Sequence, residues 1–113
     1  MGLQLMAATL IKTNSVTVAA QGDAASVSGL PSPGFVAVQV TGTLSATITF
    51  EASVDGTNYV AFNMTPSNSG TDASTTTAVG AWTKSTGAYS AFRARCSAYT
   101  SGDPVVTIRY SAQ

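Results

Sequence analysis

The side chains that could do chemistry are few in this chain. Ten of the 113 residues carry a charge, and none is histidine. Without imidazole the chain cannot form a Ser-His-Asp or Cys-His pair, nor a zinc site that contains histidine. Cys96 is the single cysteine, which excludes an internal disulfide and a cysteine-rich metal site, and its alternation with apolar neighbours predicts a buried side chain. We therefore expect no catalytic residue, no metal and no cofactor, and a protein that is not an enzyme.

The carboxylates lack the spacing of an acid–base pair. Glu51 falls on the outward face of an expected strand, and Asp55 falls in the turn that follows it. A glycosidase needs two carboxyl groups that face each other across a cleft, and this arrangement predicts none. The remaining polar turn residues lack the repeated ligands of a calcium loop, so we expect them to stabilise turns. These turn residues are Asp55, Asn58, Asp72 and Asp103.

An expected hairpin between residues 88–99 and 105–111 gathers three of the five basic side chains. The apolar residues of both strands are buried together only if the connecting loop, within residues 100–103, is odd in length. A two-residue turn would instead bury arginines without partners, which is costly. The odd loop leaves the arginines on the outer face of one ribbon, either as a solvated face or as a site for the carboxylates of a partner. They are Arg93, Arg95 and Arg109.

Four aromatic side chains could form a sugar-binding surface or contribute to packing. Rings that stack on a sugar must gather on an exposed face, whereas large aromatic side chains are usually buried. We expect packing in the core or at an interface. The residues are Tyr59, Trp82, Tyr89 and Tyr99.

The composition indicates a compact domain rich in hydroxyl groups. Thirty-one residues are serine or threonine, 44% of the chain is hydrophobic, and the formal net charge is zero. The hydrophobic content is too high for a disordered linker, and the length suits a single domain, residues 1–113. No basic cluster could neutralise phosphates, and no segment reaches membrane-spanning length. We expect neither a nucleic acid nor a membrane as partner.

Short runs of alternating apolar and polar residues, separated by Gly, Pro, Asn and Asp, extend through the chain. This period of two is typical of strands, and no segment has apolar residues at helical spacing. The pattern predicts an all-β fold, an antiparallel two-sheet β-sandwich of jelly-roll-like or Ig-like type with about eight strands. Residues 30–34 and 66–72 are expected connections. The expected strands are residues 16–20, 24–28, 35–41, 44–53, 58–65, 74–81, 88–99 and 105–111.

The register of one hairpin can be predicted from its apolar faces. Strands 44–53 and 58–65 bury both apolar sets in one register only, because a slip of one residue turns every side chain to the other face. A two-residue Asp-Gly turn is a strong hairpin signal, but here it produces the wrong register. We therefore expect a loop of odd length, residues 55–57 or 54–58. The expected pairs are Phe50 with Phe62, Ala52 with Val60, and Ile48 with Met64.

Residues 1–13 have two interpretations. They lack the charged start and long hydrophobic centre of a signal peptide, so we expect a protein that is made in the cytoplasm and stays soluble unless a partner carries it out. Exposed apolar segments often mark interaction surfaces, and the alternation suits an N-terminal arm that adds a strand to a neighbouring subunit or to a partner protein. The alternative is that they form the sandwich's own first strand. The apolar residues of this candidate interface are Leu3, Leu5, Met6, Leu10 and Ile11.

Two segments resemble small β-sandwich virion proteins of tailed bacteriophages. Residues 47–62 include Glu-Ala-Ser-Val-Asp-Gly-Thr-Asn-Tyr at the end of a strand. Residues 87–102 include Gly-Ala-Tyr-Ser-Ala-Phe-Arg-Ala-Arg and a Thr-Ser-Gly turn. The likeness spans residues 38–111 and includes no catalytic motif. It implies a structural role, either capsid decoration (cement) or an accessory module of a phage head or tail.

The same resemblance implies partners and a location. The partner would be the major capsid protein or another virion protein, and the chain would form a homo-oligomer, a dimer or a trimer. It would lie on the capsid surface of the virion after synthesis in the host cytoplasm.

A second likeness suggests a different class of function. The turn Ser-Val-Asp-Gly-Thr-Asn-Tyr and the later Tyr-Ser-Ala-Phe-Arg strand resemble galactose-binding-like discoidin domains, which are jelly-roll sandwiches that hold sugars in their end loops. This likeness implies a carbohydrate-binding or host-adhesion module of a tail or head fibre. A glycan would be a partner only under this alternative.

Overall fold

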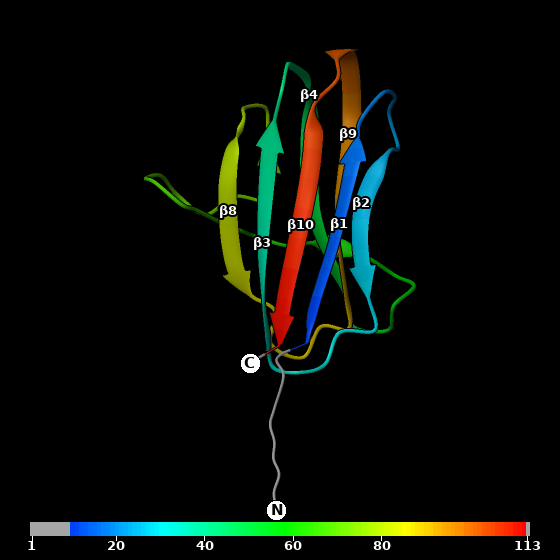
Figure 1. Cartoon of the computed structure of the whole chain (residues 1–113), viewed down its shortest axis with the longest axis vertical. Coiled ribbons are helices and arrows are strands. Elements are labelled where there is room, and N and C mark those ends of the chain that lie inside the picture. Colours follow the sequence, from blue (N-terminus) through cyan, green and yellow to red (C-terminus); the bar gives the residue numbers. More distant parts are fainter. Residues whose placement is uncertain (1–9, 113) are drawn as a thin grey trace, which may run out of the picture.

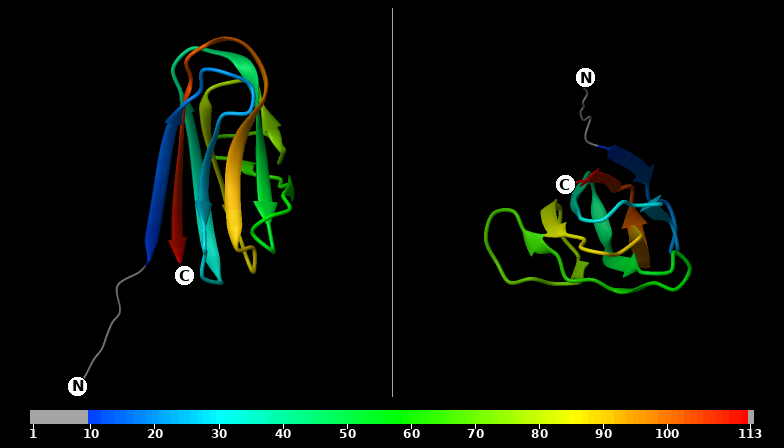
Figure 2. Two further views of the ribbon diagram at one scale, coloured as in Figure 1. Left: turned by 90° about the vertical axis from the view of Figure 1, so that its right-hand side faces the viewer. Right: turned by 90° about the horizontal axis from the view of Figure 1, so that it is seen from below.

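The chain folds into two antiparallel β-sheets that face each other as a sandwich, as Figure 1 and Figure 2 show. The computed structural model describes residues 10–112. Its ten strands in this range are β1 (Ile11–Thr17), β2 (Ala24–Ser28), β3 (Gly34–Thr41), β4 (Leu44–Ser53), β5 (Val60–Ala61), β6 (Thr65–Pro66), β7 (Thr75–Thr76), β8 (Gly80–Ser85), β9 (Ala91–Gly102) and β10 (Val105–Ala112). The predicted all-β sandwich is confirmed.

Each sheet contains five strands. Sheet A has the order β1-β10-β3-β8-β6, and sheet B has the order β2-β9-β4-β5, with β7 also paired to β4. Within the described residues, no helix is long and apolar enough to cross a membrane.

The alternation of apolar and polar residues predicts the bounds of the long strands well and those of the short strands poorly. β2 and β4 have the expected bounds, and β3 and β10 each extend by a single residue. The expected strands 58–65 and 74–81 instead break into the short strands β5, β6 and β7, and β8 begins only at Gly80. The expected strand 16–20 is wrong, because β1 ends at Thr17. There an Asp23 carboxylate oxygen accepts hydrogen bonds from the N–H groups of Ala19 and Ala20 and forms a turn.

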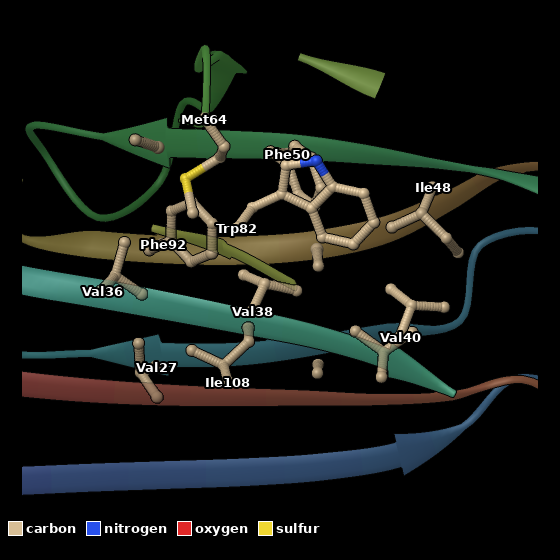
Figure 3. Packing of buried hydrophobic residues seen from close by; sticks show 14 of the residues in the cluster. Val27, Val36, Val38, Val40, Ile48, Phe50, Met64, Trp82, Phe92 and Ile108 are labelled. Atoms are coloured by element: carbon tan, nitrogen blue, oxygen red, sulfur yellow. The ribbon is translucent and has the colours of Figure 1, made fainter. Parts of the chain in front are cut away.

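The core lies between the two sheets and follows directly from the alternation. The ring centroids of Phe50 from sheet B and Trp82 from sheet A lie 5.3 Å apart, and Figure 3 shows the two side chains in contact. Cys96 is fully buried in the same core, as predicted, and burial raises the pKa of its thiol. Fully or almost fully buried residues of the core include Val36, Val38, Val40, Ile48, Phe50, Phe92, Ala94, Val106, Ile108 and Tyr110.

The expected hairpin between residues 88–99 and 105–111 is wrong. β9 pairs with β2 and β4 in sheet B, whereas β10 pairs with β1 and β3 in sheet A. The connection crosses from one sheet to the other, where Asp103 N–H donates to the carbonyl of Thr43 at 3.1 Å and Val18 N–H donates to that of Pro104 at 2.8 Å. The apolar sets of β9 and β10 therefore meet across the core from opposite sheets, instead of sharing one face of a ribbon.

The hairpin after β4 has the predicted register over its first residue pairs only. Ala52 lies opposite Val60, and Phe62 N–H donates to Phe50 carbonyl at 2.9 Å, so the connecting loop is odd, but it includes residues 53–59. The expected pair of Ile48 with Met64 is wrong, because Ile48 pairs with Thr76 of β7 and Met64 pairs with Ala73.

The predicted burial of that hairpin holds in part. Phe50 and Met64 are fully buried, Phe62 is half-buried, and Val60 is 56% exposed. The chain turns away from β4 after β5, so the outer part of this hairpin covers only the rim of the core.

The structure describes only residues 10–13 of the segment 1–13, for which an arm and a first strand were the two interpretations. Ile11 begins β1, the sandwich's own first strand, and the Leu10 carbonyl accepts a hydrogen bond from Ala112 N–H at 2.9 Å. Both side chains are exposed, Leu10 by 42% and Ile11 by 45%. Leu3, Leu5 and Met6 lie outside the described residues.

Candidate interaction site

A cluster of charged side chains stands on the outer face of sheet B. The pairing of β4 with β9 sets Glu51 directly opposite Arg93 and Thr49 opposite Arg95. Arg93 Nε donates to Glu51 Oε1 at 2.6 Å, while Arg95 donates through Nε to Oε1 at 3.1 Å and through Nη2 to Oε2 at 3.2 Å. We call Glu51, Arg93 and Arg95, together with Tyr59, the Arg–Glu cluster.

Tyr59 holds one of the two arginines in place. Its ring lies beneath Arg93, with the guanidinium carbon 4.0 Å from the ring centroid. This is cation–π geometry, which adds about 0.5–1 kcal/mol at an exposed site. Tyr59 comes from the loop that follows β4, so this loop and the sheet together orient the guanidinium group.

The cluster is strongly coupled electrostatically. Glu51 is only 8% exposed although it lies on an outer face, because the two arginines cover it. The hydrogen bond from Arg95 is the largest cause that holds the pKa of Glu51 below its usual range, and Arg93 adds to the effect while burial opposes it. The same contact raises the pKa of Arg95. Two guanidinium groups share one carboxylate, so the cluster keeps one positive charge.

The expected trio of arginines is wrong in one member. Arg109 lies on β10 with Thr13 of β1 and Ala37 of β3 as its neighbours, on the outer face of sheet A. Arg93 and Arg95 lie on sheet B, on the opposite side of the sandwich. The cause is the crossing between β9 and β10, which separates side chains that a hairpin would have joined.

Arg109 borders a shallow hollow of about 350 Å³ on sheet A. The small side chains of Ala37 and Ala81 leave space there, and Gln39, Thr83 and Thr107 supply polar groups. No carboxylate lines this hollow, so it offers no acid–base pair.

Two other carboxylates, those of Asp55 and Asp72, also stabilise the chain's own fold. Asp55 accepts hydrogen bonds from the N–H groups of Thr57 and Asn58 at 2.8 and 2.7 Å, and the Ser53 hydroxyl donates to it at 2.9 Å. The bonds from Asn58 are the largest cause that lowers the pKa of Asp55. Asp72 forms an ion pair with Lys84 at 2.8 Å. The predicted turn-forming role is confirmed for Asp55.

Residues 10–112 contain no group of three or more His, Cys, Asp or Glu side chains that could hold a metal ion. The aromatic side chains also do not gather on one face. Trp82 is buried in the core, Tyr89 packs edge-on against Phe62 at 5.3 Å, and Tyr99 donates its hydroxyl proton to the Gly102 carbonyl. The packing role predicted for these residues is confirmed.

Sequence reasoning missed Glu51 as the centre of the site. Its outward orientation was expected, but its partners depend on which strand lies beside β4. Charge complementarity between the two strands could have predicted it, because the pairing of β4 with β9 places the one glutamate of the chain opposite Arg93 and beside Arg95.

Comparisons with known proteins show which solved structures share this fold. No family model matches the chain, and no curated protein matches it in sequence. The SPBc2 prophage-derived protein YomS has a similar crystal structure, with a TM-score of 0.72 and 13% identity over 96% of this chain and 99% of that one. The PBSX exported protein XepA matches with a TM-score of 0.73 and 19% identity over 97% of this chain.

The match covers 40% of the XepA chain, so this chain spans less than half the length of that protein. The protein therefore shares its fold with these two proteins. The expected likeness to phage proteins is supported at this level.

Proposed function

We propose that this chain is a non-enzymatic structural protein of a phage particle, namely a capsid decoration (cement) protein that binds the outer face of the head and stabilises it. The observation that carries the proposal is the likeness of its fold to phage-related proteins, one of them matched over 99% of its length. The resemblance of residues 47–62 and 87–102 to virion β-sandwich proteins supports the same role.

The Arg–Glu cluster provides the contact with the shell in this proposal. Among residues 10–112, the Nη atoms of Arg93 have no hydrogen-bond acceptor, because its contact with Glu51 uses Nε. A guanidinium group binds a carboxylate through two parallel hydrogen bonds, and Tyr59 already holds this one in position. The partner is then an acidic side chain of the major capsid protein or of another virion protein.

The assembled state follows from the same role. A chain with zero net charge repels its own copies weakly, which suits a dimer or trimer on a crowded surface. The copies would reach the capsid surface after synthesis in the host cytoplasm.

The first experiment asks whether the protein is part of the particle. Particles released from the host are purified on a density gradient and probed with an antibody against this chain. The proposal expects the protein to co-migrate with intact heads. Its absence from purified particles would overturn the virion role.

A matched set of variants tests the contact. Arg93→Gln/Arg95→Gln should weaken attachment to heads that lack the protein and make the attachment less sensitive to salt, because screened charge contacts are removed. Arg109→Gln is the control, since it removes a positive charge from the opposite face. Equal binding of both variants would exclude the Arg–Glu cluster as the contact.

A further experiment distinguishes the decoration role from the host-adhesion alternative. The wild-type protein is applied to a panel of immobilised glycans from host cell surfaces. Glycan binding without head binding would favour a host-adhesion module over a decoration protein.

A further inference from the structure

Among residues 10–112, no strand is paired to one long side of β1. Leu10 and Val18 flank β1 and both bond towards β10, since the Leu10 carbonyl accepts from Ala112 N–H and Val18 N–H donates to the Pro104 carbonyl. Backbone groups alternate between the two sides of an antiparallel strand, so the even-numbered residues of β1 face β10. The N–H and C=O groups of its odd-numbered residues therefore point away from sheet A. These residues are Ile11, Thr13, Ser15 and Thr17.

The other sheet edges are short or occupied. β5 and β6, which end the two sheets on one side, are two residues long. On the other side, β2 presents outward carbonyls at Ser26 and Ser28. These accept hydrogen bonds from Asn14 Nδ2 at 2.9 Å and Lys12 Nζ at 2.7 Å.

These contacts hold the Lys12 and Asn14 side chains against β2, away from the unpaired backbone of β1. Figure 2 shows β1 at the margin of the fold beside β10, and in the described part of the chain no strand is paired to its other side.

β1 also lacks the features that usually protect a strand edge. It contains no proline, and its register with β10 runs without a bulge from Ile11 to Thr17. Its one charged side chain, Lys12, is bonded to the Ser28 carbonyl. Proline, bulges and edge charges are the devices by which natural sheets avoid pairing with other chains, so an edge without them is available for pairing.

The sequence of β1 is suited to pairing with itself. In an antiparallel pair of two copies centred on Asn14, Ile11 of one copy lies opposite Thr17 of the other, and Thr13 lies opposite Ser15. Every odd-numbered residue of one copy then lies opposite an odd-numbered residue of the other. All the N–H and C=O groups of β1 that point away from β10 can therefore form hydrogen bonds between the copies. Lys12 lies opposite Val16, so no like charges face each other. A pair centred on Thr13 or Ser15 would leave part of the edge unmatched.

We infer that two copies of this chain associate through an antiparallel pairing of their β1 strands about a two-fold axis. The pairing joins sheet A of one copy to sheet A of the other in one continuous sheet. The half-exposed side chain of Ile11 gains a neighbour on the outward face, where the Thr and Ser side chains are small. This surface is separate from the Arg–Glu cluster, and the inference does not depend on a role in a phage particle.

The test measures the mass of the full-length protein by sedimentation equilibrium over a wide concentration range. We expect a dimer that dissociates on dilution. Ser15→Pro removes an edge N–H that β10 does not use, and it should abolish the dimer while the monomer stays folded by circular dichroism. Ser15→Ala is the matched control, because it keeps that N–H and should keep the dimer.

Two further variants keep the test decisive. Thr13→Glu/Ser15→Glu sets like charges opposite each other only in the paired state, because within one copy residue 13 faces Arg109 of β10, and it should abolish the dimer even if Ser15→Pro fails to fold. Asn14→Cys should form an intermolecular disulfide across the two-fold axis, since Cα atoms of a directly opposite pair without hydrogen bonds lie about 4.5 Å apart. The exposed loop variant Asn68→Cys should not.

A full-length protein that is monomeric at all concentrations would overturn the inference. A dimer that survives both edge variants would also overturn it, as would a dimer whose Asn14→Cys form does not cross-link.

Discussion

Glu51 illustrates how one residue organises a surface. Its carboxylate accepts three hydrogen bonds from two arginines, and those arginines in turn shield it from water. Charge-assisted hydrogen bonds of this kind are roughly twice as strong as neutral ones. The cluster therefore stabilises the pairing of β4 with β9 and also presents a positive group to the outside.

We predict that Glu51→Gln lowers the free energy of unfolding by about 1–2 kcal/mol at neutral pH, because the arginines lose a charged acceptor. The folded-state pKa of Glu51 lies below its usual value, so the stabilisation is present above the unfolded-state pKa and is lost as the pH falls through the folded-state pKa. Urea unfolding of both proteins at neutral and acid pH measures this. A difference between them that stays constant down to strong acid would contradict the prediction.

Asp55 acts within a single loop. We predict that Asp55→Ala lowers the melting temperature, because the N–H groups of Thr57 and Asn58 lose their acceptor and Tyr59 is no longer held beneath Arg93. Asp103→Ala is the control, since its carboxylate has no hydrogen bond within residues 10–112. Thermal unfolding followed by circular dichroism compares the two variants. Equal melting temperatures would show that the Asp55 hydrogen bonds add nothing.

At the scale of elements, alternation predicted the bounds of several long strands but not the partners of β9. The bounds of β2 and β4 follow from their own apolar period and from the turns beside them. The partners of β9 do not, because its apolar residues are buried equally well in a hairpin with β10 or across the core from it. The grouping of Arg109 with Arg93 failed for that reason.

The crossing between β9 and β10 depends on Gly102, which has a φ of +97°. A Cβ at this position would collide with the carbonyl oxygen of Thr43. We predict that Gly102→Ala lowers the free energy of unfolding by about 3 kcal/mol, from backbone strain and overpacking together.

Gly22→Ala is the matched control. Gly22 has nearly the same φ, +98°, but a Cβ there meets nothing within 4 Å. We expect this variant to lose only about 1–2 kcal/mol from strain. Equilibrium unfolding in urea compares both variants with the wild type, and equal losses would contradict a role for the contact with Thr43.

At the scale of the whole molecule, the two sheets are joined by apolar packing, because the chain has no disulfide. Phe50 is fully buried and contacts Trp82 across the sandwich. We predict that Phe50→Ala lowers the free energy of unfolding by about 3–5 kcal/mol.

Val60→Ala, at a 56% exposed position of the adjoining hairpin, should change the free energy of unfolding by less than about 0.5 kcal/mol. Chemical denaturation of the two variants measures the contrast. A small loss for Phe50→Ala would mean that the core reorganises around the cavity.

The contact between the Leu10 carbonyl and Ala112 N–H places both ends of the described chain at one corner of the sandwich, as Figure 1 shows. A short linker could therefore close the chain into a circle, and new ends could be opened in the exposed loop at residues 67–72 without cutting a strand. The same geometry would let the whole sandwich be spliced into a surface loop of a larger protein, because the two stems of that loop would stay side by side.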